Sequence, residues 1–265
     1  MEAGKTIAEH SIGDYGVIGN GRTAALIARN GSIDWCCWPR FDSPAVFCRI
    51  LDARRGGCLR VEPKTAYATS RNYLGLTNVL ATTFQTADGQ VRITDFMPSP
   101  SDANGQRIFP HRILRKLEGV AGRVELEVVL HPTFNYARSS AAFEVRSSGV
   151  IARSGNEALS LVSPIPLHQK ADALVGQQTL TAGESAWLVL THRPAEEAGS
   201  QLRFSHADAD AELDRTTEYW YQWADACRYE GPYQDLVQRS ALLLKLLIFC
   251  SSLATTMNRC GSSIG

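Results

Sequence analysis

The sequence predicts a mainly β protein, a large antiparallel β-sandwich that is followed by helices. Over about the first two hundred residues, segments of alternating apolar and polar residues come in pairs, and turn signals such as Asn30-Gly31 and Asp88-Gly89 separate the members of a pair. Alternation with period two is typical of strands, and these dipeptides favour the tight turns of hairpins. The helical segments that parallel strands need as crossovers are missing from this region, so antiparallel sheets are expected.

The first hairpin decides between two interpretations of a glycine-rich pattern. Gly19, Gly21 and Ala24 fit the G-x-G-x-x-A fingerprint of dinucleotide-binding oxidoreductases, and Asp42 follows about where a ribose ligand is expected. That fingerprint needs a helix directly after the glycines, because the helix N-terminus holds the pyrophosphate. Asn30-Gly31 instead predicts a hairpin turn too early for such a helix. We therefore expect residues 19–24 to form a turn between short strands, with no dinucleotide or other cofactor.

Further strands are expected along the same stretch, each bounded by turn residues. Gly119 and Gly122 are expected to lie in a turn between two strands. The expected strands are residues 79–84 and 91–96, 113–117 and 124–130, 143–146 and 150–153, and 158–162 and 186–191. In residues 124–130 the apolar side chains alternate with Glu125 and Glu127, so these two carboxylates are expected to face solvent.

The pattern changes from strands to helices near residue 207. Leu213, Trp220 and Trp223 share one face of an expected helix over residues 207–229, and Gly231-Pro232 ends it. Residues 236–249 then form a strongly apolar helix, of the kind that is normally buried against other helices. The sequence after this segment has no periodicity.

Composition narrows the classes of partner. The chain has 265 residues, with 27 Lys and Arg against 27 Asp and Glu, and this balance argues against a nucleic-acid or anionic-membrane partner. No apolar run is long enough for a membrane span and no export signal is visible, so we expect a cytoplasmic protein. Seven cysteines without a C-x-x-C pair are expected to be reduced thiols, and the scattered histidines predict no metal site.

Several motifs in fixed order resemble the N-terminal domain of bacterial glycoside hydrolase family 15 proteins, the trehalase and glucoamylase-like group. The motifs are residues 12–16, 30–35, 39–44, 77–80, 94–98, 227–232 and 239–247. The resemblance covers about residues 8–249. It implies a β-sandwich, a helical linker and an (α/α)₆ barrel, in which two glutamates invert α-glucosidic bonds. Such chemistry needs two carboxyl groups about 6.5–9.5 Å apart.

The resemblance also implies a division of the chain. Residues 1–206 are expected to form the β-sandwich, 207–231 the helical linker, and 232–265 the truncated start of the barrel. From Cys250 the sequence departs from the family pattern, which we attribute to a truncation or a shifted reading frame. The barrel glutamates lie beyond this chain, so no catalytic residue is expected in it. The expected partners are the missing barrel, and trehalose or another α-glucoside in the full-length protein.

One loop is a candidate for substrate binding. Arg40 and Asp42 could hydrogen-bond sugar hydroxyls, while Trp38 or Phe41 offers a stacking face. The alternative is a buried Arg40–Asp42 pair that only pins the loop. Asp14 and Asp34 are expected at turns and edges, with a structural role.

Two functions of different classes remain from the sequence. The first is the non-catalytic domain of an α-glycosidase of the trehalase or glucoamylase type, inactive alone. The second is a self-contained β-sandwich module that binds α-glucans on exposed aromatic side chains. A helix at residues 233–249 that packs on nothing favours the first, and an aromatic platform on a sandwich face favours the second.

Overall fold

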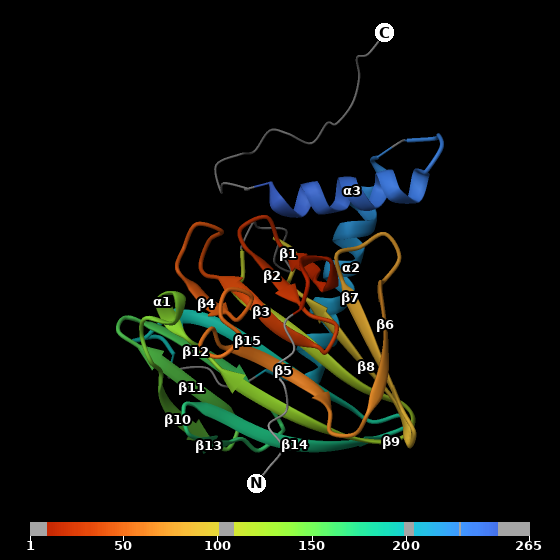
Figure 1. The fold of residues 1–265 in the computed structure, drawn as a ribbon. Coiled ribbons are helices and arrows are strands. Elements are labelled where there is room, and N and C mark those ends of the chain that lie inside the picture. Colours follow the sequence, from red (N-terminus) through yellow and green to blue (C-terminus); the bar gives the residue numbers. More distant parts are fainter. Residues whose placement is uncertain (1–9, 101–108, 199–203, 228, 249–265) are drawn as a thin grey trace.

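The computed structural model describes residues 10–100, 109–198, 204–227 and 229–248, and in this part of the chain it is a two-layered β-sandwich with helices at one side and one end (Figure 1). All pairs of neighbouring strands are antiparallel, which confirms the predicted sandwich. The two layers are joined by one strand, β9 (Arg112–His131), which belongs to both.

The first layer has the strand order β1-β2-β3-β5-β9-β14-β13, with β4 on the side of β3 that also carries β5. Its strands are β1 (Gly16–Gly19), β2 (Ala24–Ile27), β3 (Ser32–Cys37), β4 (Ala45–Cys48), β5 (Cys58–Pro63), β13 (His168–Lys170) and β14 (Ala173–Thr181). The predicted turn at Asn30-Gly31 is confirmed, because β2 and β3 are antiparallel neighbours and Gly31 has a φ of 75°. A positive φ is the reason glycine suits this position.

The second layer has the order β6-β7-β8-β9-β15-β12-β11-β10. Its strands are β6 (Tyr67–Tyr73), β7 (Leu80–Thr86), β8 (Gly89–Phe96), β10 (Ala142–Arg146), β11 (Gly149–Ser154), β12 (Glu157–Val162) and β15 (Ser185–Pro194). The predicted strands at residues 79–84, 91–96, 143–146, 150–153, 158–162 and 186–191 are thus confirmed.

The predicted turn between residues 113–117 and 124–130 is wrong. These residues form the single strand β9, whose first part pairs with β8 and β15 and whose second part pairs with β5 and β14. Gly119 and Gly122 lie where the strand passes from one layer to the other, and Gly122 has a φ of 60°. A Cβ on Gly119 would collide with the carbonyl of Thr181. The glycines therefore permit a bend and a close backbone approach, which is the other common role of glycine in a strand.

The core between the layers contains one fully buried ion pair. Arg115 on β9 donates from Nε to Asp95 Oδ1 (2.6 Å) and from Nη2 to Asp95 Oδ2 (3.2 Å). The same guanidinium donates to the carbonyls of Leu59 (2.9 Å) and Gly31 (2.5 Å) in the first layer. Both side chains are completely buried. Because Asp95 lies on β8, this arginine ties the two layers together.

The helices begin after the last strand. α2 (His206–Asp225) confirms the predicted helix, and Ala209 and Leu213 pack with Phe96 and Trp187 on the second layer. Its N-terminus is capped by Ser205. The remaining short helices are η1 (Ile12–Asp14) and α1 (Phe134–Ala137). None of the described helices is both long enough and apolar enough to cross a bilayer.

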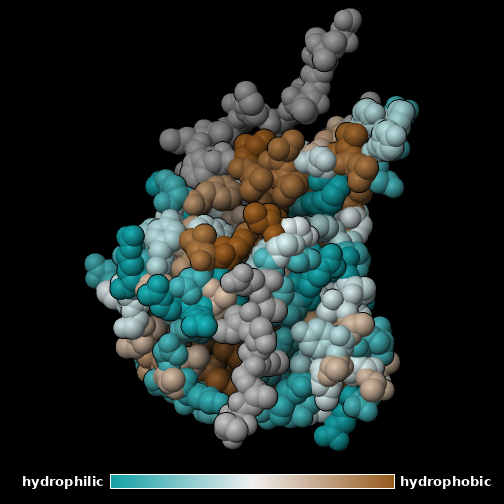
Figure 2. Space-filling model, in the orientation of Figure 1, coloured by the Kyte–Doolittle hydropathy of each residue, from teal (hydrophilic) through white to brown (hydrophobic). Residues whose placement is uncertain are grey.

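The last helix, α3 (Gln234–Leu247), lies across the end of the sandwich near β1 (Figure 1). Leu242 and Leu246 are buried against Trp220 of α2 and Val17 of β1. Its other face is open, and Figure 2 shows apolar side chains gathered there. The exposed apolar residues at and just beyond α3, which we call the open face of α3, are Tyr233, Leu236, Val237, Leu244, Leu247 and Ile248. The helix is therefore half packed, not packed on nothing.

The cysteines in the described residues are free, as predicted: Cys36, Cys37, Cys48, Cys58 and Cys227. Residues 249–265, including Phe249, Cys250, Cys260 and the tail with the departing pattern, lie outside the described residues.

Candidate functional site

The candidate substrate loop, residues 38–44, joins β3 to β4 and is held at both ends. Arg40 N donates to Ser43 Oγ (3.1 Å), and Ser43 N donates to the carbonyl of Arg40 (3.1 Å). Phe41 N donates to the carbonyl of Arg22 (2.9 Å) in the turn between β1 and β2. The loop follows a cis peptide bond between Trp38 and Pro39. These bonds fix the loop against a second turn of the first layer.

Arg40 and Asp42 form an ion pair, but the pair faces solvent. Arg40 Nε lies 3.0 Å from Asp42 Oδ1, and Nη2 donates to Oδ2 at 3.1 Å. Their side chains are 52% and 72% exposed, so the buried pair of the structural alternative is wrong. An exposed pair adds about 0–1 kcal/mol to stability. The guanidinium and carboxylate therefore contribute little to the fold, and their outer edges are accessible to a partner.

Trp38 does not have the exposed face that a stacking role requires. Its side chain is fully buried in the core. The indole ring lies 5.9 Å from the ring of His192, and its Nε1 has no hydrogen-bond partner among the described residues. Phe41 is half-buried and is more accessible than Trp38. Trp38 thus supports the loop from inside.

The turn between β1 and β2 is the turn predicted for residues 19–24, and a strand follows it where a nucleotide fold would have a helix. Asn20 Oδ1 accepts from the backbone N of Arg22 (3.1 Å) and of Thr23 (3.3 Å). Gly21 has a φ of 80°, which glycine tolerates. A Cβ on Gly19 would lie 2.6 Å from Leu246 Cδ2, so the turn directly abuts α3. The loop, the turn and the end of α3 therefore form one continuous region.

α3 is held in one orientation by a polar clamp that the sequence did not reveal. Arg239 Nη1 donates to the carbonyl of Thr77 (2.6 Å), Nη2 donates to Asn78 Oδ1, and the guanidinium carbon lies 3.9 Å from the ring centre of Tyr73. Asn78 Nδ2 in turn donates to the carbonyl of Leu242 (3.1 Å). Burial lowers the pKa of Arg239, and the neighbouring Tyr73 opposes this shift. The clamp orients the open face of α3 relative to the sandwich.

α1 is a single turn that winds left-handed. Asn135, Tyr136 and Ala137 have φ values of 51°, 57° and 60°. A left-handed conformation costs residues other than glycine about 1–2 kcal/mol each. The turn places Tyr136 beside the candidate loop, where its hydroxyl donates to the carbonyl of Ser43 (3.4 Å) and its ring centre lies 6.3 Å from that of Trp35. Asn135 is the one residue in this turn whose type signals left-handed backbone.

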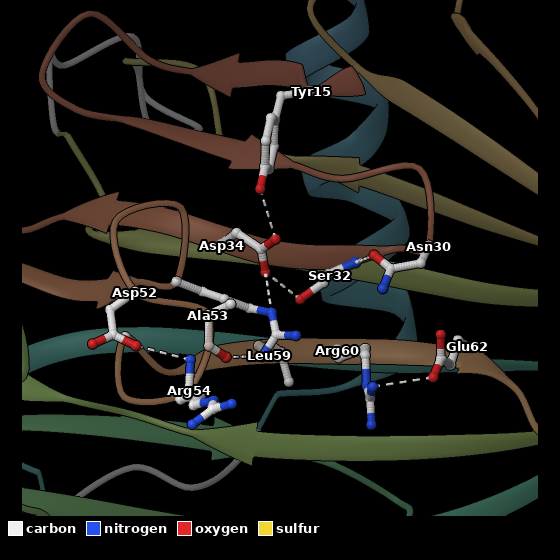
Figure 3. A network of polar contacts seen from close by, with 12 residues as sticks. Tyr15, Asn30, Ser32, Asp34, Asp52, Ala53, Arg54, Leu59, Arg60 and Glu62 are labelled. Carbon is white, nitrogen blue, oxygen red and sulfur yellow. Dashed lines mark hydrogen bonds and ion pairs between the residues drawn. The ribbon is translucent and has the colours of Figure 1, made fainter. Parts of the chain in front are cut away.

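Asp34 is buried, which corrects its expected place at an edge (Figure 3). Its carboxylate accepts from Tyr15 OH (2.9 Å) and Ser32 Oγ (2.5 Å), and Arg49 Nε lies 3.7 Å away. Burial raises the pKa of Asp34, while the bonds from Ser32 and Tyr15 and the charge of Arg49 lower it. Arg49 also donates to the carbonyl of Ala53 (2.8 Å). These contacts hold β3 to the loop after β4, which is a structural role.

The remaining carboxylates that were considered are on the surface. Asp14 pairs with Arg29 (2.9 Å) at the surface. Glu125 pairs with Lys64 (2.9 Å), while the half-exposed Glu127 pairs with Arg60 (3.0 Å), so the prediction for these glutamates is confirmed. The strongly exposed aromatic residues of the described part are Tyr136, Tyr221, Tyr229 and Tyr233, and the last three lie on or between α2 and α3. They do not form one platform on a sandwich face.

The buried His192 behind Trp38 predicts a pH dependence of stability. Burial lowers the pKa of His192 to about 4. Glu157 Oε1 lies 3.4 Å from its Nε2, but burial raises the pKa of Glu157. The nearby His111 also has a lowered pKa, through burial and His192. Between the unfolded pKa of about 6.5 and the folded value, the unfolded chain binds more protons, so the stability contributed by neutral His192 is lost as pH falls.

We expect the free energy of unfolding to fall by about 2 kcal/mol from pH 7 to pH 5 through His192 alone. The measurement is urea unfolding of the protein and of His192→Phe at both pH values. The variant should lack this share of the pH dependence, and comparison of the two removes the contribution of other titrating groups. Parallel pH profiles would contradict a neutral buried imidazole.

Comparisons with known proteins add what the geometry does not contain. A family model described as "Trehalase-like, N-terminal" matches residues 5–198. The trehalase of Thermoplasma volcanium is 35% identical over 241 residues, which cover 89% of this chain and 37% of the relative. The trehalase of Mycolicibacterium smegmatis is 30% identical over 262 residues, covering 90% of this chain and 38% of the relative. The chain thus spans less than two fifths of these curated relatives.

Proposed function

Because this chain belongs to the family of trehalase-like N-terminal domains, we propose that it is the non-catalytic β-domain of an α-glycosidase of the trehalase or glucoamylase type. The observation that carries the proposal is the family match over residues 5–198, which covers the sandwich. The relatives extend well beyond the aligned part, and we place the two glutamates of inverting hydrolysis in that remainder.

The proposed intramolecular partner is a helical catalytic domain that packs on the open face of α3. This face is supported as a docking surface by its apolar composition and by the polar clamp of Arg239, which keeps its orientation fixed. Full burial of an aliphatic side chain gains about 1.5–3 kcal/mol, so covering this face would contribute strongly to the association.

We propose that Arg40 and Asp42 face the substrate pocket of the assembled protein, with Trp38 supporting their loop. Their exposure and their continuity with the end of α3, through the turn at Gly19, support this assignment. The proposed substrates are trehalose or another α-glucoside. A cytoplasmic location is also part of the proposal, and it is supported by the free thiols of the described residues.

The chain alone is expected to release no glucose from trehalose, maltose or soluble starch. The reason is that both catalytic carboxyl groups are assigned to the catalytic domain. The experiment incubates the purified 265-residue protein with each substrate and measures glucose, with a complete trehalase relative as the positive control. Hydrolysis that co-purifies with the chain, and is absent from a mock preparation of the same host, would contradict the proposal.

A further inference from the structure

The left-handed turn α1 holds one aromatic side chain at the surface at an energetic cost. The backbone around Tyr136 is fixed by Phe134, which is buried in the core, and by the bonds from Thr133 N to the carbonyl of Val46 (3.0 Å) and from Ser139 N to the carbonyl of Phe134 (3.2 Å). Strained backbone persists only where the surroundings impose it, and it concentrates at ligand-contacting positions. Here it presents a tyrosine that is 40% exposed.

Tyr136 stands between a second aromatic ring and the charged loop. The rings of Tyr136 and Trp35 are inclined at 47°, so they form two walls of a corner and not a flat stack. The hydroxyl of Tyr136 donates to the carbonyl of Ser43, the residue after Asp42. The aromatic corner and the exposed Arg40–Asp42 pair are therefore neighbours on one surface.

The chemistry of this surface selects a neutral polyol. Arg40 and Asp42 cancel in charge, so neither an anion nor a cation is favoured by net charge. They offer N–H donors and carboxylate acceptors, which suit adjacent hydroxyl groups. The rings of Tyr136 and Trp35 offer apolar faces to the C–H face of a sugar ring. A pyranose ring has both properties at once.

We propose that Tyr136 and Trp35, with Arg40 and Asp42, form a shallow binding surface for a glucosyl ring of an α-glucoside. The sugar ring packs in the aromatic corner, and its hydroxyls bond to the outer edges of the Arg40–Asp42 pair. The choice of an α-glucoside among neutral sugars rests on the proposed function. Because the surface is open, the chain alone binds weakly, in the millimolar range.

The test titrates the 265-residue protein with trehalose, maltose and maltotriose, followed by tryptophan fluorescence and ligand-observed NMR. Saturable binding is expected for at least one of these sugars. Tyr136→Gly and Asp42→Ala should each weaken it at least fivefold, whereas Tyr136→Phe should keep most of it because the ring remains. The matched control is Tyr221→Ala, since Tyr221 on α2 is exposed to a similar extent, and it should change binding less than twofold.

A second readout separates a ligand contact from a structural role. Tyr136→Gly removes the positive-φ strain, so its Tm should equal or exceed that of the unaltered chain while binding is lost. Absence of saturable binding to all three sugars would overturn the proposal, as would equal loss of binding in Tyr136→Phe and Tyr136→Gly, or unchanged binding in Tyr136→Gly. None of these results bears on the hydrolysis assay, so failure of this site is distinguishable from failure of the proposed function.

Discussion

Replacing Arg115 with methionine is expected to lower the free energy of unfolding by about 3–5 kcal/mol. The substitution leaves the Asp95 carboxylate buried without its partner, and it removes the donors to the carbonyls of Leu59 and Gly31. A buried charge without a partner cannot be reached by water, so its cost exceeds that of a lost surface ion pair. Since Arg115 bonds to both layers, this is the largest single-residue effect that we expect in the sandwich.

The measurement is chemical denaturation of Arg115→Met beside Arg92→Met as the matched control. Arg92 pairs with Glu118 (3.2 Å) at a half-exposed position, so its replacement should cost about 1 kcal/mol or less. The double replacement of Asp95 and Arg115 by apolar residues should cost less than the sum of the single replacements, because it leaves no unpaired charge. A loss below that of Arg92→Met would show that Arg115 does not join the layers.

Two leucines of α3 are expected to behave oppositely. Leu246→Ala should cost about 2–5 kcal/mol, because this side chain is fully buried against the end of the sandwich. Leu244→Ala should change stability by about 0.5 kcal/mol or less, because the Leu244 side chain is 64% exposed on the open face of α3. Leu244→Ala should also reduce any self-association of the chain, since it removes exposed apolar area.

Thermal or urea unfolding measures the first effect, and analytical ultracentrifugation measures the second. Both variants remove the same atoms from the same helix, so helix propensity is matched between them. Equal destabilisation by the two substitutions would contradict the packing of α3, because it would mean that this helix buries a different face or does not pack at all.

The strands next to clear turn signals were predictable from sequence. Asn30-Gly31 and Asp88-Gly89 name the turn, and the alternation beside them names the strand. β9 was not, because glycine within a strand pattern marks either a turn or a bend. Only the partners across each layer decide between them, and Gly119 meets the backbone near Thr181, which is distant in sequence. The half-packed state of α3 likewise depends on contacts with Val17 and Trp220.

The candidate site was predictable only where local sequence fixes the outcome. The loop with Arg40 and Asp42 stood out because proline bounds it on both sides. The burial of Trp38 depends on the opposite layer, and no local pattern reports it. Tyr136 was missed because a left-handed turn without glycine has almost no sequence signature apart from Asn135. Asp34 was misplaced because its partners, Tyr15 and Arg49, come from other elements.

The most direct test of the central proposal is trehalose hydrolysis by a chimera. The segment of the Thermoplasma volcanium trehalase that aligns with this chain, 241 residues in the alignment, is replaced by the corresponding residues of this chain. If the chain is the non-catalytic domain that docks through the open face of α3, the chimera should release glucose from trehalose. The same chimera with Leu244→Asp and Leu247→Asp should lose that activity. A folded chimera without activity, or one that is indifferent to both substitutions, would contradict the account.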